Sequence, residues 1–356
     1  MKRQNVIKFL LAISVLGLLL IGGDLSAEAQ KPQVIQVDQP GSLHIIPEAI
    51  GQTGGTATAV AWKNNVAFVG IGPRVYALDV SDHTMPALIS KTYVLPVYIS
   101  ELAIEGSYLY VADVEGGLRI FDISDPDHLI ETGKYAGVAY GVTVQGGYAY
   151  VPGVVGLQIV DISNPAAPFQ VGYYASPINQ VAVSGNYAYV SYFVNDNDGG
   201  MRVVDISDPA HPIETGYVNT LSNPWNVAIA GNYAYLASAS KLSIIDVSDP
   251  TQPIETGFFA SSVSDVDVVG KYAYVTEGDF GLRIVDITNP AAPFEVGSCR
   301  TPGEAYDIVV GETFAYIAAM EGGLRIIDVS RVDYPVEMGF YKNSSLKEAR
   351  TVALAG

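Results

Sequence analysis

The chain of 356 residues has one cysteine, Cys299, and few basic residues. A single cysteine excludes an intramolecular disulfide. Lys and Arg total 19 against 37 Asp and Glu, which gives a formal charge of −18, and no basic cluster follows the first eight residues. We therefore expect neither nucleic-acid binding nor attachment to an anionic membrane surface, because both depend on clustered cations.

Motifs for catalysis and cofactor binding are also scarce. The sequence lacks G-x-x-x-x-G-K-[ST] and has no dinucleotide G-x-G-x-x-G after a predicted strand. Three of its four histidines, His83, His128 and His211, belong to different repeats, so we expect neither a shared zinc site nor a Ser-His-Asp triad. Charged residues make up only 16% of the chain and hydrophobic ones 49%, which excludes disorder for its bulk.

Residues 1–29 have the pattern of a secretory signal peptide. Basic residues follow Met1, the run from Phe9 to Ile21 is apolar or small, and Ala27-Glu28-Ala29 fits a small-x-small cleavage site. An uncleaved membrane anchor is the alternative, although a spanning helix needs about 20 apolar residues. We expect cleavage after residue 29 and an acidic mature protein that is secreted or held at the cell surface.

An internal repeat organises the rest of the chain. The segment Gly281–Pro290 has relatives at intervals of 39 to 44 residues, each with an aspartate at the same place. The matching aspartates are Asp79, Asp122, Asp161, Asp205, Asp246, Asp286 and Asp328. Seven copies at so regular a period indicate a repeat architecture.

Each repeat divides into four short runs rich in Val, Ile and Tyr, separated by Gly, Asn, Asp and Pro. In the fifth repeat these runs are Val227–Ala230, Tyr233–Ala237, Leu242–Val247 and Ile254–Phe258. Such spacing predicts strands and turns without helices. Adjacent apolar residues within the runs indicate sheets covered on both faces, which radial stacking achieves. We predict an all-β fold, a β-propeller of seven four-stranded antiparallel blades.

The motifs in Gly185–Val190 and Gly281–Pro290 resemble those of the LVIVD-repeat family. The resemblance covers residues 56 to 349 and implies a secreted or surface-associated β-propeller. It implies no particular activity and carries over no catalytic residue.

The number of blades has an alternative. Residues 351–356 match residues 226–231 and would begin an eighth inner strand, a partial eighth repeat. The N-terminal extension, residues 30–55, would supply the three outer strands of that closing blade. We predict seven blades within a propeller of residues 56–356, with eight blades as the alternative.

The joints between strands differ in how much they vary, and this difference distinguishes the structural face of the propeller from the face that carries the candidate site. The first-to-second and third-to-fourth joints are uniform, and they share one side of a propeller, which we call the uniform face. The second-to-third joints and the crossovers between blades vary and share the other side, the variable face. Binding residues usually lie on such loops, so we place the site there. Examples are Asp113–Glu115, Asn195–Gly200, the crossover from Asn219 to Trp225, and Glu277–Asp279.

The first residues of the inner strands should surround the mouth of the central channel. They are Glu101, Gly141, Gln180, Asn226, Asp265 and Asp307, with Tyr140, Trp225 and Tyr306 just before three of them. This set predicts an acidic pocket for a cation or a polyhydroxyl ligand. Asp265 and Asp307 are the candidate calcium ligands. A water-filled channel without a ligand is the alternative.

The favoured function is a secreted or cell-surface binding or adhesion scaffold for a protein or glycan partner. The alternative is a hydrolase or lyase that uses calcium, or uses Asp265 and Asp307 as general acid and base. That chemistry requires the two carboxylates to lie within about 10 Å of each other, one with a raised pKa.

Overall fold

A computed structural model describes residues 57–153, 156–195, 198–311, 313–341 and 353–354. The predicted signal peptide (1–29) and N-terminal extension (30–55) lie outside the described residues. The described elements are strands, apart from one 3-10 turn at Met320–Gly322, so the all-β prediction is confirmed. Among them no helix has the length and apolar character that crossing a membrane would require.

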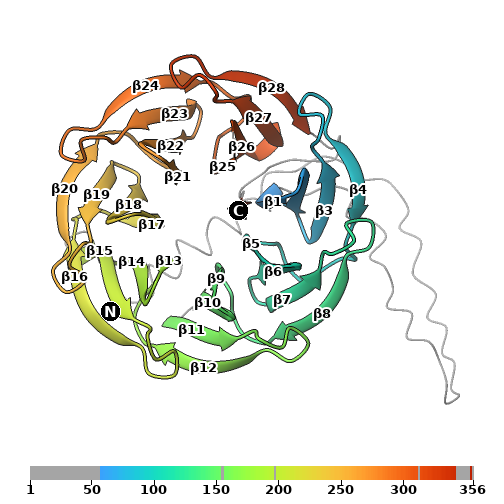
Figure 1. The fold of residues 1–356 in the computed structure, drawn as a ribbon, viewed down its shortest axis with the longest axis horizontal. Coiled ribbons are helices and arrows are strands. Elements are labelled where there is room, and N and C mark those ends of the chain that lie inside the picture. The colour runs from blue at the N-terminus through green and yellow to red at the C-terminus, as the bar shows by residue number, and fades with distance from the viewer. Residues whose placement is uncertain (1–56, 154–155, 196–197, 312, 342–352, 355–356) are drawn as a thin grey trace, which may run out of the picture. The chain divides into compact units, whose positions relative to one another are not determined.

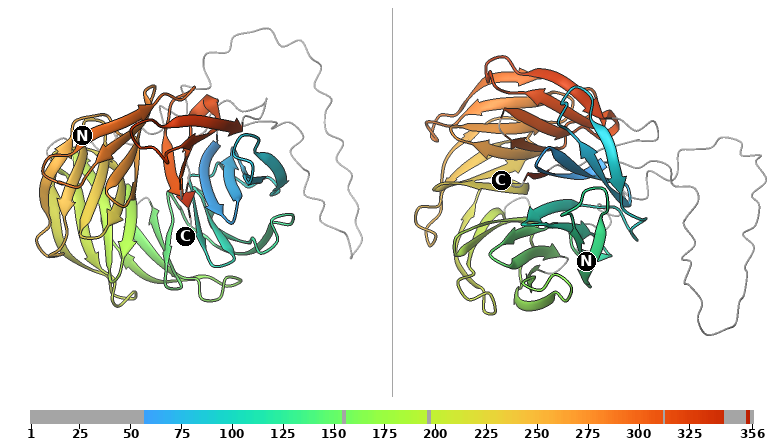
Figure 2. Two further views of the ribbon diagram at one scale, coloured as in Figure 1. Left: turned by 45° about the horizontal axis from the view of Figure 1, so that its top comes forward. Right: turned by 45° about the vertical axis from the view of Figure 1, so that its right-hand side comes forward.

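Seven antiparallel four-stranded sheets stand around a common axis as the blades of a β-propeller (Figures 1 and 2). Blade 1 consists of β1 (Ala57–Lys63), β2 (Val66–Ile71), β3 (Arg74–Asp79) and β4 (Ala87–Lys91). Blade 2 consists of β5 (Glu101–Glu105), β6 (Tyr108–Asp113), β7 (Gly117–Asp122) and β8 (Ile130–Tyr135). Blade 3 consists of β9 (Thr143–Gln145), β10 (Tyr148–Gly153), β11 (Gly156–Asp161) and β12 (Phe169–Tyr174).

The remaining blades follow in chain order. Blade 4 consists of β13 (Gln180–Ser184), β14 (Tyr187–Asn195), β15 (Asp198–Asp205) and β16 (Ile213–Asn219). Blade 5 consists of β17 (Pro224–Ala230), β18 (Tyr233–Ser238), β19 (Leu242–Asp246) and β20 (Ile254–Phe259). Blade 6 consists of β21 (Asp265–Val269), β22 (Tyr272–Glu277), β23 (Gly281–Asp286) and β24 (Phe294–Cys299). Blade 7 consists of β25 (Asp307–Gly311), β26 (Phe314–Ala318), β27 (Leu324–Asp328) and β28 (Val336–Tyr341).

The number of blades is seven, as predicted. The C-terminal strand β29 (Ala353–Leu354) does not begin an eighth blade. It pairs in parallel with β1, which makes it a fifth strand on the inner edge of blade 1. The sequence similarity of this segment to an inner strand therefore predicts its strand conformation, but it does not predict the blade that the strand joins.

The repeated aspartates hold the end of each third strand. In every blade the Oδ1 atom of this aspartate accepts a hydrogen bond at 2.8 or 2.9 Å from the backbone N–H two residues later, for example Ser248 N to Asp246. Such side-chain bonds fix the turn that leads to the fourth strand. The recurrence of these aspartates therefore serves the scaffold in every blade.

The apolar core lies between neighbouring blades. Tyr150 and Ile159 of blade 3, for example, belong to one buried cluster with Val181 and Val190 of blade 4. Tyr150 is the second tyrosine of a Tyr-x-Tyr pair, and its side chain is buried. The recurring tyrosines therefore serve packing between blades.

In six of the seven blades, a glycine in the fourth strand lets the blade approach the next one. A Cβ at this glycine would lie less than 3.0 Å from a carbonyl oxygen in the third-to-fourth turn of the following blade, closer than real Cβ atoms come. The pairs are Gly133 with Pro165, Gly172 with Pro209, Gly216 with Pro250, Gly257 with Pro290, Gly297 with Val332, and Gly339 with His83. The last pair joins blade 7 to blade 1. At the remaining seam Ser90 Oγ donates to the Pro126 carbonyl at 2.5 Å, so the ring is closed.

Replacing one of these glycines should weaken its seam. Gly297→Ala places a methyl group against the Val332 carbonyl, and overpacking of this kind costs about 1–3 kcal/mol of unfolding free energy. The neighbouring exposed Ser298→Ala is the control and should change stability by less than about 0.5 kcal/mol. Urea denaturation measures both. Equal stability of the two variants would contradict close packing at this seam.

Candidate functional site

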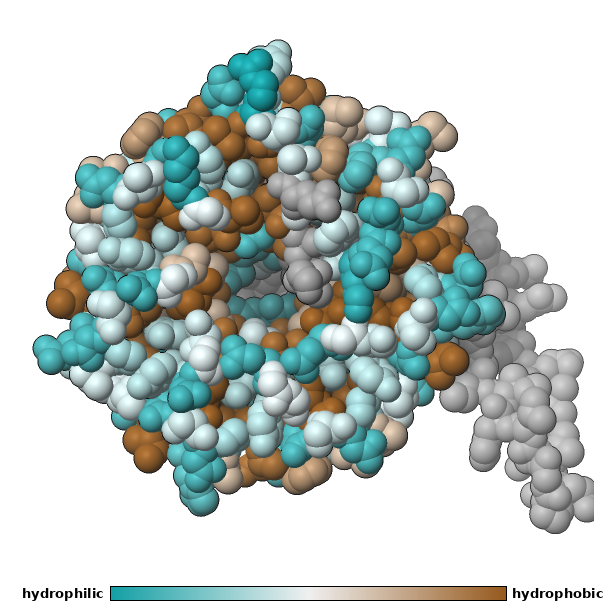
Figure 3. All heavy atoms as spheres, in the orientation of Figure 1, coloured by the Kyte–Doolittle hydropathy of each residue, from teal (hydrophilic) through white to brown (hydrophobic). Residues whose placement is uncertain are grey.

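The predicted polar residues begin or nearly begin the inner strands, around the middle of the ring. Glu101, Gln180, Asp265 and Asp307 are the first residues of β5, β13, β21 and β25, and Asn226 is the third residue of β17. Hydrophilic surface is visible at the centre of the ring in Figure 3. The structure brings these residues together in two groups.

Glu101 and Gln180 form the first group. Gln180 Nε2 donates to Glu101 Oε2 at 2.8 Å, and the backbone N–H of Val142 donates to the same oxygen at 2.8 Å. Gly141 lies between them, and a Cβ at this position would collide with both side chains. Gly141 precedes the inner strand of blade 3. Because it has no side chain, Glu101 of blade 2 can reach Gln180 of blade 4.

Asn226, Asp265 and Asp307 form the second group. Asn226 Nδ2 donates to Asp265 Oδ1, and the backbone N–H of Ile308 donates to Asp265 Oδ2 at 2.8 Å. The Asp307 and Asp265 side chains are hydrogen bonded to each other. Both are buried, with 4% of Asp265 and 6% of Asp307 exposed. Blades 5, 6 and 7 are thus joined through one buried carboxylate.

Burial makes these carboxyl groups weak acids. Desolvation raises the pKa of Glu101 to about 7, although hydrogen bonds from Gln180 and Val142 oppose the rise. Desolvation and the neighbouring negative charge of Asp265 raise the pKa of Asp307 well above its usual range. The raised pKa favours the neutral, protonated form of Asp307 beside Asp265. Desolvation also raises the pKa of Asp267, the next inward-facing acid on β21, to about 6.

The carboxylate oxygens of Asp265 and Asp307 offer few free ligand positions to a calcium ion. Both oxygens of Asp265 already accept hydrogen bonds, and Asp307 Oδ2 is the one fully buried carboxylate oxygen without a hydrogen-bond partner among the described residues. Calcium takes six to eight oxygen ligands. Within the described part of the chain no group of three or more His, Cys, Asp or Glu residues is placed to hold a metal ion. Calcium binding stays a prediction.

The predicted aromatic residues are more accessible than the polar ones. Tyr140 and Tyr306 precede the inner strands of blades 3 and 7, and Trp225 is the second residue of β17 in blade 5. Each leaves close to half of its surface exposed. Trp225 Nε1 donates to the Val263 carbonyl of the next blade at 2.9 Å, which fixes the indole beside the mouth. Accessible aromatic groups, rather than the buried acids, therefore face solvent on this side of the ring.

Two exposed residues of the variable face were not singled out from the sequence, although the predicted crossover from Asn219 to Trp225 contains the first of them. Leu221, in the crossover from blade 4 to blade 5, is 70% exposed and has a left-handed backbone with φ 53°. Bulky residues rarely adopt that conformation. Tyr98, in the crossover into blade 2, is 51% exposed. No sequence signal marks the backbone of Leu221, and Tyr98 lies too far before its inner strand to fit the pattern used for Tyr140.

The architecture defines a seven-bladed β-propeller, and the comparisons with known proteins define its family. Six consecutive segments match the LVIVD repeat: residues 98–137, 136–176, 178–220, 223–261, 260–301 and 302–343. Together they make up more than half of the chain, so the protein belongs to the LVIVD-repeat family. The matches correspond to blades 2 to 7, and blade 1 precedes the first of them. No curated protein matches the chain.

Solved structures resemble the chain in fold at low sequence identity. Sqt1 of Saccharomyces cerevisiae has a TM-score of 0.61 at 6% identity, over 81% of this chain and 86% of that one. The Cps50 (Swd1) β-propeller domain of Myceliophteria thermophila has 0.60 at 14%, over 76% and 95%. The computationally designed Ika8 protein has 0.60 at 11%, over 82% and 90%. Identities this low indicate a shared fold and nothing about function.

The buried acids should make stability depend on pH. Their folded-state pKa values exceed the ordinary values, from 4.5 to about 7 for Glu101 and from 3.8 to about 6 for Asp267, so the folded protein holds more protons than the unfolded chain between these limits. The contribution of these two groups to stability is then greatest below their ordinary pKa values of 4.5 and 3.8. It should fall as pH rises toward 7, by about 1.4 kcal/mol per pH unit for each such carboxylate in its window.

Asp307→Asn tests the origin of this dependence. The amide carries no charge, so the variant should lose less stability than the wild type between pH 5 and pH 8. Exposed Asp127→Asn removes a charge from the uniform face and should leave the slope unchanged. Denaturant unfolding at several pH values gives the slopes, and identical slopes for all three proteins would contradict the assignment.

Proposed function

We propose that the protein is a binding scaffold, secreted or held at the cell surface, that engages a protein or glycan partner through its variable face. The LVIVD repeats and the closed ring supply a rigid support of seven similar blades. The pattern of residues 1–29 supports the location outside the cytoplasm. Recognition is then left to the loops that differ from blade to blade.

The crossover between blades 4 and 5 carries this proposal. Leu221 exposes 70% of its surface in a strained backbone conformation, and Trp225 exposes 40% of its surface a few residues later. Asn219 Oδ1 accepts the Leu221 N–H at 2.9 Å, and the Thr220 and Ser222 hydroxyls are 2.7 Å apart, so the loop is held in this shape. Strain that buries no apolar surface contributes nothing to folding, which favours a role in recognition.

The carboxyl pair supports a second candidate, a hydrolase or lyase. Asp265 and Asp307 are hydrogen bonded, and Asp307 has the raised pKa that a general acid requires. Only 4% and 6% of these residues are exposed, however, and both oxygens of Asp265 are engaged in joining blades. Access for a substrate is therefore restricted, and the accessible aromatic surface favours binding over catalysis.

A binding screen with matched variants tests the proposed function. Leu221→Asn removes the apolar side chain and suits the left-handed backbone, and Trp225→Phe removes the indole but keeps a ring. Against panels of proteins and glycans, each change should reduce the affinity for a partner about tenfold or more, as central aromatic contacts do.

Tyr334→Ala, which removes an exposed ring from the uniform face, is the control and should bind like the wild type. A partner whose affinity falls only in this variant would place recognition on the uniform face and overturn the proposal.

A further inference from the structure

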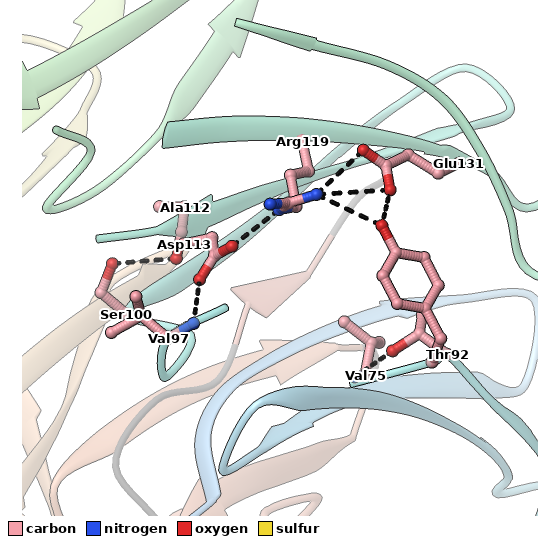
Figure 4. A network of polar contacts seen from close by, with 9 residues as sticks. Val75, Thr92, Val97, Ser100, Ala112, Asp113, Arg119 and Glu131 are labelled. Carbon is pink, nitrogen blue, oxygen red and sulfur yellow. Dashed lines mark hydrogen bonds and ion pairs between the residues drawn. The ribbon is translucent and has the colours of Figure 1, made fainter. Parts of the chain in front are cut away.

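A buried polar network shapes the variable face of blade 2 (Figure 4). Arg119 Nε donates to Asp113 Oδ2 at 2.6 Å, and Arg119 Nη1 donates to Glu131 at 3.1 Å. The other oxygen of Asp113 accepts the backbone N–H of Val97 at 3.1 Å. Asp113 is fully buried, so the carboxylate ties the crossover into blade 2 to the end of β6. Breaking a buried ion pair of this kind is strongly destabilising, which makes the loop positions well defined.

Three exposed side chains belong to residues that come directly after Val97, Val114 and Ala139. Val114 pairs with Ala139, whose N–H donates to the Val114 carbonyl at 2.8 Å. Glu115 and Tyr140 come next after these two residues, and Tyr98 follows Val97. Tyr98 is 51% and Tyr140 44% exposed, and Glu115 is exposed as well. Val114 has φ 23°, a strained value for a β-branched residue.

Tyr140 lies within electrostatic reach of Tyr98 and Glu115. Burial raises the pKa of the Tyr140 hydroxyl, and Tyr98 and Glu115 add to the rise. Within the described residues no hydrogen bond, ion pair or cation contact involves the side chain of Tyr98, Tyr140 or Glu115. Two accessible rings and one free carboxylate therefore lie together on the variable face.

The matching loop of blade 6 carries an aromatic ring at another position, Phe280, where blade 2 has Gly116. There Gly278 pairs with Ala305 as Val114 pairs with Ala139. The guanidinium groups of Arg283 and Arg300 lie over the Phe280 ring, 5.4 Å and 5.3 Å from its centre. Arginine side chains of this protein thus lie over the exposed ring of the blade 6 loop, and among the described residues no such cation contact involves Tyr98 or Tyr140.

We propose that Tyr98, Tyr140 and Glu115 bind an arginine side chain of a basic partner protein. A guanidinium group stacks on aromatic rings and bonds a carboxylate with two parallel N–H groups, which a lysine ammonium cannot do. The net charge of −18 draws a basic partner toward the protein. The proposal rests on the proposed function and names the chemistry of the partner.

Fluorescence anisotropy with labelled hexa-arginine and hexa-lysine peptides at physiological salt tests the inference. The wild type should bind hexa-arginine more tightly than hexa-lysine. Tyr140→Leu and Glu115→Gln should each weaken hexa-arginine binding about two- to fivefold, as the loss of one exposed cation–π or charged contact predicts. Tyr140→Phe keeps the ring and should bind like the wild type.

Asp127→Asn and Tyr334→Ala remove a charge and a ring from the uniform face and serve as controls. Equal weakening in these controls, or equal affinity for both peptides, would show general attraction between opposite charges and overturn the inference. If the screen finds a partner that needs Leu221 and Trp225 but no variant of Tyr140 or Glu115 alters arginine binding, the inference fails while the proposed function stands. If the screen variants also leave every partner's affinity unchanged, the proposed function fails too.

Discussion

Close approach of each blade to the next is the constraint on which this structure depends. A four-stranded sheet that is apolar on both faces must be covered on both sides, and a closed ring covers every sheet without leaving an end blade exposed. In six blades a glycine in the fourth strand allows that approach, because a Cβ there would collide with the turn of the following blade, and in blade 1 Ser90 bonds that turn instead. Gly339 approaches the His83 carbonyl in the same way at the seam between blades 7 and 1, where the ring closes.

The same constraint explains why the polar residues at the centre are buried. An inner strand presents backbone N–H groups toward the channel, and Glu101, Asp265 and Asp267 accept such groups from the next blade along. A buried donor without a partner costs about 1–3 kcal/mol, so each of these carboxylates stabilises a seam. The carboxyl groups that resemble a ligand site in the sequence thus already accept hydrogen bonds that join the blades. Recognition is left to the exposed groups of the variable face.

Much of the fold could be predicted from the sequence because every blade repeats it. The spacing of aspartates such as Asp246 gave the number of blades, and the four runs around it gave the strands. The positions of Asp265 and Asp307 followed from the same alignment, but their burial did not, because contact between strands of different blades leaves no local pattern. Exposed Tyr98 and the left-handed backbone of Leu221 lie in crossovers, where the repeat gives no guide.

Distances across the last seam test the closed ring most directly. In a Cys299→Ser background, spin labels at Ala87 and Val336 lie on the first residues of β4 and β28, in blades 1 and 7. Labels at Ile254 and Phe294 lie at the same places in the adjacent blades 5 and 6. Double electron–electron resonance should give the two pairs closely similar mean distances. A clearly longer distance between Ala87 and Val336 would mean that the blades form an open stack.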